Sequence, residues 1–343
     1  MSLIPTVYRS TDPGAPVLNG QAGSLIALLH AVLVTGYGSG QTAKPPAGWS
    51  RPYSNGDVHV YRNSPVSGSG SYLRVRDDAS APMLGTGRLA QALAYSSMSD
   101  IDSGQDCTPS PELQSQGSLI AKSPLQTAAS RPWLMIATEI GFYLFTSWHN
   151  YPNGMGAYYY GDILSNMLGD VYSFAVFGSA ALSGFSGAWS DPVCSLFYTT
   201  ALNTPLVNAP NLGIASTGGY VMRGYSGGNN APGRIETTGY PAVGGNSSRM
   251  SYGSGAFMVG PDPSHGGYNY IEAVVREAPF AIRGKLPGVI APLHARPHAA
   301  GSVVPFVDGI GLGQWLVVNY NVAEPDTAAR DGQVLFRTDV AWK

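Results

Sequence analysis

The only stretch in the chain with the spacing of a known nucleophile motif is Gly224-Tyr-Ser-Gly-Gly228. It matches Gly-x-Ser-x-Gly, the turn that exposes the reactive serine of many hydrolases. That chemistry needs a strand before Ser226, a helix after it, and acid and histidine partners further along the chain. Residues 220–223 suit a strand, but Asn229-Asn-Ala-Pro-Gly233 is a poor start for a long helix. We therefore predict a turn, with a Ser226-centred hydrolase as an alternative.

Two groups of residues have spacings that resemble metal sites. His294 and His298 are four residues apart, a ligand spacing that requires a helix, but Pro297 lies between them. Asp100, Asp102 and Ser103 resemble the start of a calcium loop, which needs a third ligand two residues on, a glycine at its sixth position and a glutamate at its twelfth. We expect an extended surface segment and a polar turn, and no metal ligand at either place.

Two further candidates receive structural interpretations. Asp308-Gly-Ile-Gly-Leu-Gly313 lacks the Lys-Ser/Thr of a phosphate loop and the full dinucleotide fingerprint, so we predict a turn. His30 stands among leucines, which favours a residue at the edge of the core over a ligand. We thus expect no catalytic, cofactor-binding or metal-binding residues and no cofactor.

Tyrosines are the remaining candidates for binding. The chain has 20 of them, and they include Tyr158-Tyr-Tyr160 and Tyr268-Asn-Tyr270. Aromatic rings can stack on the C–H faces of sugars, which would make these tyrosines a carbohydrate platform. Tyrosine is equally common in edge strands and protein interfaces, so both interpretations stay open.

The composition is that of a turn-rich β protein. Charged residues are 12% of the chain, against about 25% in an average soluble domain, while it holds 44 glycines and 26 prolines. The formal net charge of −2 gives no electrostatic signature of a nucleic-acid or membrane partner. So few charges favour a surface that is partly covered by neighbouring subunits.

Targeting and redox signals are weak. Cys107 and Cys194 form no Cys-x-x-Cys pair, which fits folding in a reducing cytoplasm. The N-terminal Met1-Ser-Leu-Ile-Pro5 lacks the features of a signal peptide, and no apolar run reaches the ~20 residues that span a membrane.

The elements that organise the chain are predicted between residues 21 and 78. Dense apolar residues predict a helix over 21–35, which Gly36 ends. The runs 58–61 and 72–75 predict a β-hairpin around a loop of Asn, Ser, Pro and Gly. We expect Trp49, Val60 and Leu73, or residues on the same faces, to be buried against Leu25, Leu28 and Leu29 of the helix.

The rest of the chain reads as further strands. A strand or short helix is expected over 87–98, a linker over 103–130 and a loop over 150–160. A second hairpin is expected over 131–148, a strand pair over 161–187, and closing strands over 270–275, 280–283, 315–320 and 333–339. The fold class is mainly β, with β-sandwich or hairpin-rich domains and one N-terminal α-helix on the first sheet. The expected domains are 1–130 and 131–343, the second with an insertion at about 179–267 that is rich in Gly, Ser and Tyr and gains order from neighbouring subunits.

The order of several short stretches is informative. The stretches are Ala15-Pro-Val-Leu-Asn-Gly-Gln-Ala-Gly-Ser-Leu-Ile-Ala-Leu-Leu29, Pro46-Ala-Gly-Trp-Ser-Arg-Pro-Tyr-Ser54, Val60-Tyr-Arg62, Tyr72-Leu-Arg-Val-Arg-Asp-Asp78, Met98-Ser-Asp-Ile-Asp-Ser-Gly104, Arg131-Pro-Trp133, Phe142-Tyr-Leu144, Tyr160-Gly-Asp-Ile163 and Arg283-Gly-Lys-Leu-Pro-Gly-Val-Ile-Ala-Pro-Leu-His294. In this order they resemble a family of virion structural proteins of long-tailed bacteriophages, encoded among tail and head morphogenesis proteins. They lie within 15–177 and 270–294. Residues 36–44 are a short linker where family members often carry a small β domain.

The resemblance implies a non-enzymatic component of the tail, baseplate or neck. Its partners would be further copies of itself and other virion proteins, and it would be made and assembled in the host cytoplasm and end in the virion. The family has no established catalytic residues, so none are implied here. A decoration or fibre-like module that binds host surface glycans is the first alternative, and the Ser226 hydrolase is the second.

Overall fold

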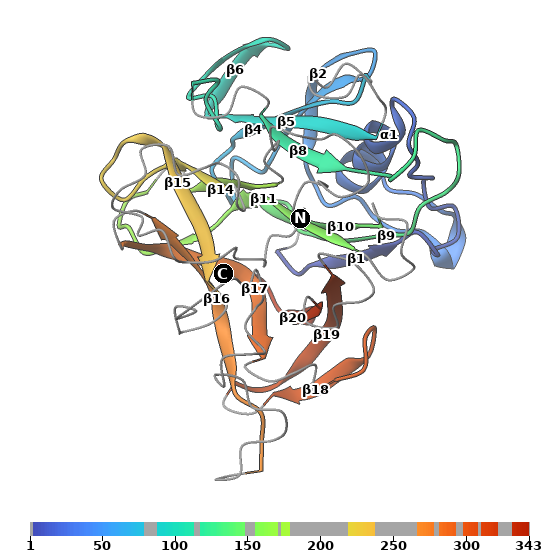
Figure 1. Cartoon of the computed structure of the whole chain (residues 1–343), viewed down its shortest axis with the longest axis vertical. Helices are drawn as coiled ribbons and strands as arrows, with labels where there is room; N and C mark the ends of the chain where they lie inside the picture. Colours follow the sequence, from blue (N-terminus) through green and yellow to red (C-terminus); the bar gives the residue numbers. More distant parts are fainter. Residues whose placement is uncertain are drawn as a thin grey trace.

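The computed structural model describes residues 3–78, 88–112, 117–147, 155–170, 173–178, 219–236, 266–277, 281–292, 298–307, 310–321 and 331–342. These residues form a mainly β protein with antiparallel sheets and an α-helix near the N-terminus, as the sequence predicts (Figure 1). Within them, no helix is long and apolar enough to cross a membrane.

The helix α1 spans Ser24–His30 and continues as a π-helical turn over Ala31–Thr35. It begins three residues later than predicted, since Gly23 adopts a left-handed conformation (φ 77°) in front of it. Gly36 ends it with a positive φ of 76°, as predicted. A short 3-10 turn, Gly40–Thr42, follows in the linker.

A five-stranded antiparallel sheet, called here the small sheet, follows the helix. Its strand order is β2 (Ser50–Asn55), β3 (Val58–Arg62), β4 (Tyr72–Arg76), β5 (Leu89–Tyr95) and β8 (Ser118–Ala121). The β3–β4 hairpin is the predicted one, and 87–98 contains a strand rather than a helix. Strands β6 (Ser97–Asp100) and β7 (Ser103–Gln105) form a separate hairpin beside it.

The remaining strands form a large antiparallel sheet, the second layer of the fold. Its order is β1 (Thr6–Arg9), β9 (Trp133–Ala137), β10 (Gly141–Thr146), β11 (Gly156–Asp162), β13 (Phe174–Phe177), β14 (Gly219–Arg223), β15 (Asn229–Glu236), β16 (Tyr270–Glu277), β17 (Ala281–Pro292), β20 (Asp331–Arg337), β19 (Gly311–Asn321) and β18 (Val303–Val307), with β12 (Leu164–Ser165) paired to β17. The 131–148 hairpin and the closing strands are confirmed. Because β1 pairs with β9, hydrogen bonds cross the boundary expected at residue 130, and that division stays a prediction.

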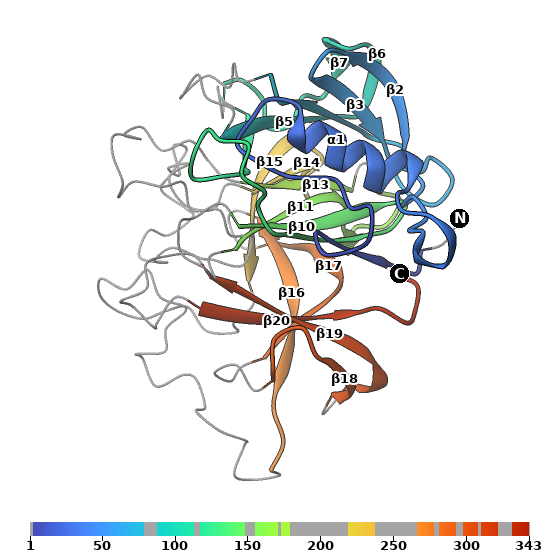
Figure 2. The same cartoon turned by 90° about the vertical axis from the view of Figure 1, so that its right-hand side faces the viewer.

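Two hydrophobic cores lie on opposite faces of the first strands of the large sheet. Phe142 and Leu144 of β10 belong to a core that also contains α1 and the small sheet, while Tyr143 and Phe145 belong to a core shared with β16, β17, β19 and β20. The ring of Tyr143 lies 4.7 Å from that of Phe336, so the large sheet folds back on itself. Figure 2 shows α1 between the small sheet and strands β10 and β11. Strands buried on both faces need no polar alternation, which explains the continuous apolar run of β10.

One predicted face of the first hairpin is wrong. Tyr61 pairs with Leu73, and His59 with Val75, so Tyr61, Leu73 and Val75 form the face that joins the core containing α1. Val60 pairs with Arg74 and is buried on the opposite face, beside Tyr95 and Met98. Trp49 and Leu73 are buried with Leu25, Leu28 and Leu29, as expected. Met98 of the β6–β7 hairpin covers Val60, so this face of the small sheet is buried without the helix.

Three segments predicted as irregular contain strands. The expected linker 103–130 holds β7 and β8, and β8 is fully buried. The expected loop 150–160 contains most of β11, which is buried at every residue. Inside the expected insertion, 219–236 forms two strands of the large sheet, and the other residues of 179–265 lie outside the described part. For β8, β11 and β14, pairing to a strand distant in the sequence overrides a local composition typical of loops.

Candidate functional site

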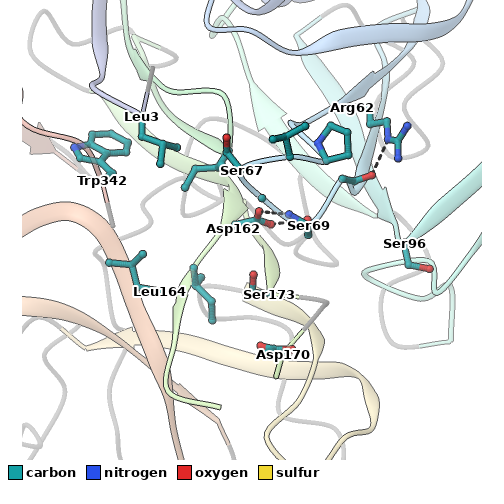
Figure 3. Close-up of a pocket in the computed structure, with 16 residues that line it drawn as sticks. Leu3, Arg62, Ser67, Ser69, Ser96, Asp162, Leu164, Asp170, Ser173 and Trp342 are labelled. Carbon is teal, nitrogen blue, oxygen red and sulfur yellow. Dashed lines mark hydrogen bonds between the residues drawn. The ribbon is translucent and has the colours of Figure 1, made fainter. Parts of the chain in front are cut away.

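A cavity of about 810 Å³ lies where the β3–β4 loop meets the large sheet (Figure 3). Its upper wall is the loop 65–70, and its floor comes from the segments after β11 and before β13. Both ends of the described chain contribute, through Leu3 and Trp342. The lining is Leu3, Arg62, Pro65, Val66, Ser67, Gly68, Ser69, Gly70, Ser96, Ile140, Asp162, Ile163, Leu164, Asp170, Ser173 and Trp342.

Asp162, the last residue of β11, joins the two walls. Its carboxylate accepts hydrogen bonds from the backbone N–H and the hydroxyl of Ser69, both at 2.6 Å. Gly68 permits this approach, because a Cβ there would lie 2.3 Å from Oδ2 of Asp162. Asp162 therefore ties the β3–β4 loop to the large sheet, as does Glu139, whose carboxylate accepts the hydroxyl of Ser67 at 3.0 Å.

Asp162 is a perturbed acid. Its side chain is almost completely buried, and burial raises its pKa to about 6, although the hydrogen bonds from Ser69 act in the opposite direction. The carboxylate is therefore ionised at neutral pH and becomes protonated under mildly acidic conditions. A buried carboxyl at the wall of a cavity is a reasonable candidate for a binding group.

The second acid of the cavity, Asp170, belongs to a buried ion-pair network. Arg283 of β17 is fully buried and pairs with Asp170, and its Nε lies 3.3 Å from Oε1 of Glu277. The guanidinium also donates to the carbonyl of Arg223 at 2.9 Å and to the hydroxyl of Ser165 at 2.5 Å. Asp170 and Glu277 thus share one buried guanidinium, and the network holds β14, β16 and β17 together.

Another buried ion pair lies beside the start of α1. Lys122, after β8, pairs with Asp77, after β4, and both side chains are fully buried. The other oxygen of Asp77 accepts the N–H of Leu25 in the first turn of α1 at 2.8 Å, while Lys122 donates to the carbonyl of Gln21 at 2.6 Å. Burial raises the pKa of Asp77 and lowers that of Lys122. This pair is architectural.

Ser226 lies in an exposed turn between β14 and β15. The strand before it is the predicted one, but a strand rather than a helix follows, so the strand-turn-helix context of the hydrolase motif is missing. The neighbouring N–H of Tyr225 donates to Glu277 at 2.8 Å, which fixes the turn to β16. The prediction of a turn is confirmed.

The residues whose spacing resembles metal sites, Asp100 with Asp102 and His294 with His298, have other partners or lie outside the described residues. Asp102 pairs with the buried Arg74 at 2.5 Å, and Asp100 caps the turn by accepting the N–H of Ile101 at 2.7 Å. His294 lies outside the described residues, as do Asp308 and Gly309 of the glycine-rich turn. His298 stacks on Tyr270, with 6.1 Å between ring centroids, and its Nε2 lies 2.5 Å from the Tyr270 hydroxyl.

Two smaller predictions concern His30 and the cysteines. His30 is half-buried at the end of α1, at the edge of the core, with its ring 6.2 Å from that of His59. Burial and the nearby Arg51 lower the pKa values of both histidines. Cys107 is a half-buried free thiol whose pKa is raised by burial, and Cys194 lies outside the described residues.

The tyrosine platform is only partly available. Tyr158, Tyr159 and Tyr160 are completely buried in β11, so they cannot stack on a sugar. Tyr268 and Tyr270 are half-buried and their rings contact His298. Of the two interpretations left open, the platform is ruled out at 158–160, because those side chains fill the two cores on either side of the strand.

Comparison with known proteins adds no family. Neither the scan against protein-family models nor the search of curated proteins finds a match to this chain.

The residues that line the cavity were missed by sequence reasoning. Asp162 and Ser69 are 93 positions apart, and Asp170 and Arg283 are 113 apart, so no local motif connects them. A partial signal existed, because Tyr160-Gly-Asp-Ile163 and Arg283 lie in stretches that resemble the phage family.

Proposed function

We propose that this chain is a non-enzymatic structural component of a tailed-bacteriophage virion that acts through contacts between subunits. The first support is the ordered series of sequence stretches described above. The second is the role of those stretches in the fold, which is architectural. The third is the set of exposed aliphatic side chains on the β18–β19 hairpin at the outer edge of the large sheet, and this observation carries the proposal.

Two tryptophans within the stretches that resemble the phage family form hydrogen bonds between distant parts of the fold. The indole of Trp49 donates to the carbonyl of Thr138 at 2.9 Å and its ring lies 5.6 Å from that of Phe142. The indole of Trp133 donates to the carbonyl of Pro16 at 3.0 Å. Together with the buried Arg283, these residues hold the sheets together. Residues with this role suit a structural protein.

Both edges of the large sheet are protected against the addition of a further strand. At β1, the carbonyl of Val7 accepts a hydrogen bond from the ammonium of Lys44 at 3.0 Å. The N–H of Arg9 donates a hydrogen bond to the carboxylate of Asp12 at 2.8 Å. At β18, Pro305 interrupts the edge and the register shifts between Val304 and Phe306. Proline and bulges are common devices that block edge pairing. Subunits would therefore meet through side chains.

The β18–β19 hairpin offers such side chains. Leu312 is 78% exposed, Val303 50% and Ile310 41%. Large aliphatic groups gathered on one exposed hairpin mark an interaction surface more often than isolated ones do. The chain also has few charges, so a contact here would desolvate little charge. A second copy of the chain is the partner that fits a homo-oligomeric virion component.

Light scattering coupled to size-exclusion chromatography of the purified chain tests the contact. We expect the natural chain to form an oligomer at micromolar concentration and the double variant Ile310→Ser with Leu312→Ser to elute as a monomer. Val17→Ser, a control at a 55% exposed residue elsewhere, should still form the oligomer. A natural chain that stays monomeric at all concentrations would contradict the proposed contact.

Immunogold electron microscopy of purified phage particles tests the location. We expect gold at one defined part of the particle, the tail, baseplate or neck. If the protein is abundant in the lysate but the purified particles carry no gold label, the virion proposal is contradicted.

A further inference from the structure

The cavity around Asp162 has a mixed chemical character. The lining offers hydroxyl groups, from Ser67, Ser69 and Ser173, beside the buried carboxylate. It also contains the aliphatic side chains of Leu3, Val66 and Leu164. At about 810 Å³ the space falls within the range of about 300–1,000 Å³ that is usual for ligand sites. Such a lining suits a ligand that has both polar groups and C–H faces.

The charges of the cavity argue against a charged ligand. Asp170 pairs with Arg283, which is shared with Glu277, and the guanidinium of Arg62 donates to the carbonyl of Gly70 at 2.9 Å while lying 5.0 Å from the ring centroid of Tyr72. The carboxylate of Asp162 would repel an anion. A cation would find one buried carboxylate whose oxygens already accept two hydrogen bonds from Ser69.

Asp162 retains capacity for hydrogen bonds. An ionised carboxylate has about four acceptor positions, and the bonds from Ser69 and the side chain of Asn63 leave one of them for a ligand. A hydrogen bond from a neutral hydroxyl to a carboxylate is stronger than one between neutral groups. A ligand hydroxyl that reaches Asp162 would therefore be held firmly and in a fixed orientation.

We propose that this cavity binds an uncharged saccharide, with sugar hydroxyls bonded to Asp162 and the serine hydroxyls and the C–H face of the sugar against Leu3, Val66 and Leu164. Glycan binding in this position differs from the tyrosine platform considered from the sequence, because it uses the junction of the two sheets. The proposal concerns the free chain and does not depend on its assembly. Either proposal can therefore fail without the other.

Ligand-observed saturation-transfer NMR on the purified full chain tests this site. The probes are the methyl glycosides of glucose, galactose, mannose and N-acetylglucosamine, each at millimolar concentration, with galacturonic acid as the anionic counterpart. We expect at least one neutral glycoside to bind and galacturonic acid to bind more weakly. If no neutral glycoside binds, the cavity holds water only and the proposal is overturned.

Two variants locate the binding. Asp162→Asn should weaken the affinity about tenfold or more, because it removes the charged acceptor. Ser173→Leu, which narrows the cavity without touching the Asp162–Ser69 bonds, should also abolish binding and covers the case in which Asp162→Asn fails to fold. Asp100→Asn, at an exposed turn, is the matched control. Binding that survives in folded Ser173→Leu would place the sugar elsewhere and refute the site.

Discussion

The ammonium of Lys122 and the carboxylate of Asp77 form an ion pair in which neither side chain has any exposed surface. The pair connects the ends of β8 and β4 to the first turn of α1, through Gln21 and Leu25. Taking two charges out of water is costly, and the geometry here compensates with further hydrogen bonds to the backbone. The position of the helix on the small sheet therefore depends on a contact between residues 45 positions apart.

Replacement of Lys122 should be strongly destabilising. Lys122→Met leaves Asp77 buried without its partner, and we expect the free energy of unfolding to fall by about 3–5 kcal/mol. Lys285→Met, which breaks the exposed pair with Glu272, should cost less than about 1 kcal/mol. Urea denaturation of both variants measures the difference. Equal losses in the two variants would show that burial of the Lys122–Asp77 pair has no energetic consequence.

Asp162 should make stability depend on pH in an unusual direction. Its pKa is raised in the folded chain to about 6, above its ordinary value of 3.8, so the folded state binds the proton more readily than the unfolded state. Stability from this group is therefore greatest below pH 4, falls as the pH rises to about 6, and is constant above that. The full change is up to about 3 kcal/mol.

The measurement is the difference in unfolding free energy between the natural chain and Asp162→Asn, at pH values from 4 to 8. We expect the natural chain to lose stability relative to the variant between pH 4 and 6. The same series with Asp100→Asn corrects for other titrating groups. A difference that does not vary with pH would mean that Asp162 titrates alike in the folded and unfolded chains.

The packing of α1 is tested by Leu28, which is fully buried in the core between the helix and the sheets. Leu28→Ala should cost about 2–5 kcal/mol, the usual penalty for emptying a core position. Ala27→Ser, on the exposed face of the same helix, should stay within about 0.5 kcal/mol. Thermal or urea unfolding compares them, and a small effect at Leu28 would show that the helix is packed differently.

The sequence was sufficient for the helix, the first hairpin and the closing strands, because their apolar patterns are local. It was insufficient for β11, where Tyr158, Tyr159 and Tyr160 follow a segment rich in glycine and asparagine. Those tyrosines are buried because the strand lies between two cores, one on each face. Such burial depends on strands that are far away in the sequence, so no local pattern could reveal it.

The candidate site was out of reach for the same reason. Asp162 gains its environment from Ser69 and the β3–β4 loop, and Asp170 from Arg283. Candidates based on local motifs could be judged from the sequence. Ser226 lies in the turn that was predicted, and Asp102, for which no metal site was predicted, forms an ion pair with Arg74. Residues brought together by long-range strand pairing leave no fixed spacing to read.

The region 179–267 was expected to gain order from neighbouring subunits, but its segment 219–236 is built into the large sheet. Arg234 and Ile235, in β15, are opposite Arg276 and Val275 of β16, and β14 pairs with residues 229–233 on the other side of β15. A protease must bind its substrate in an extended, unpaired form, so the Arg234–Ile235 bond should resist trypsin in the free chain. Mass spectrometry of a limited digest measures cleavage at this bond, with the urea-unfolded chain as the control that must be cut there. Rapid cleavage in the free chain, together with slow cleavage in assembled particles, would show that neighbouring subunits order this segment.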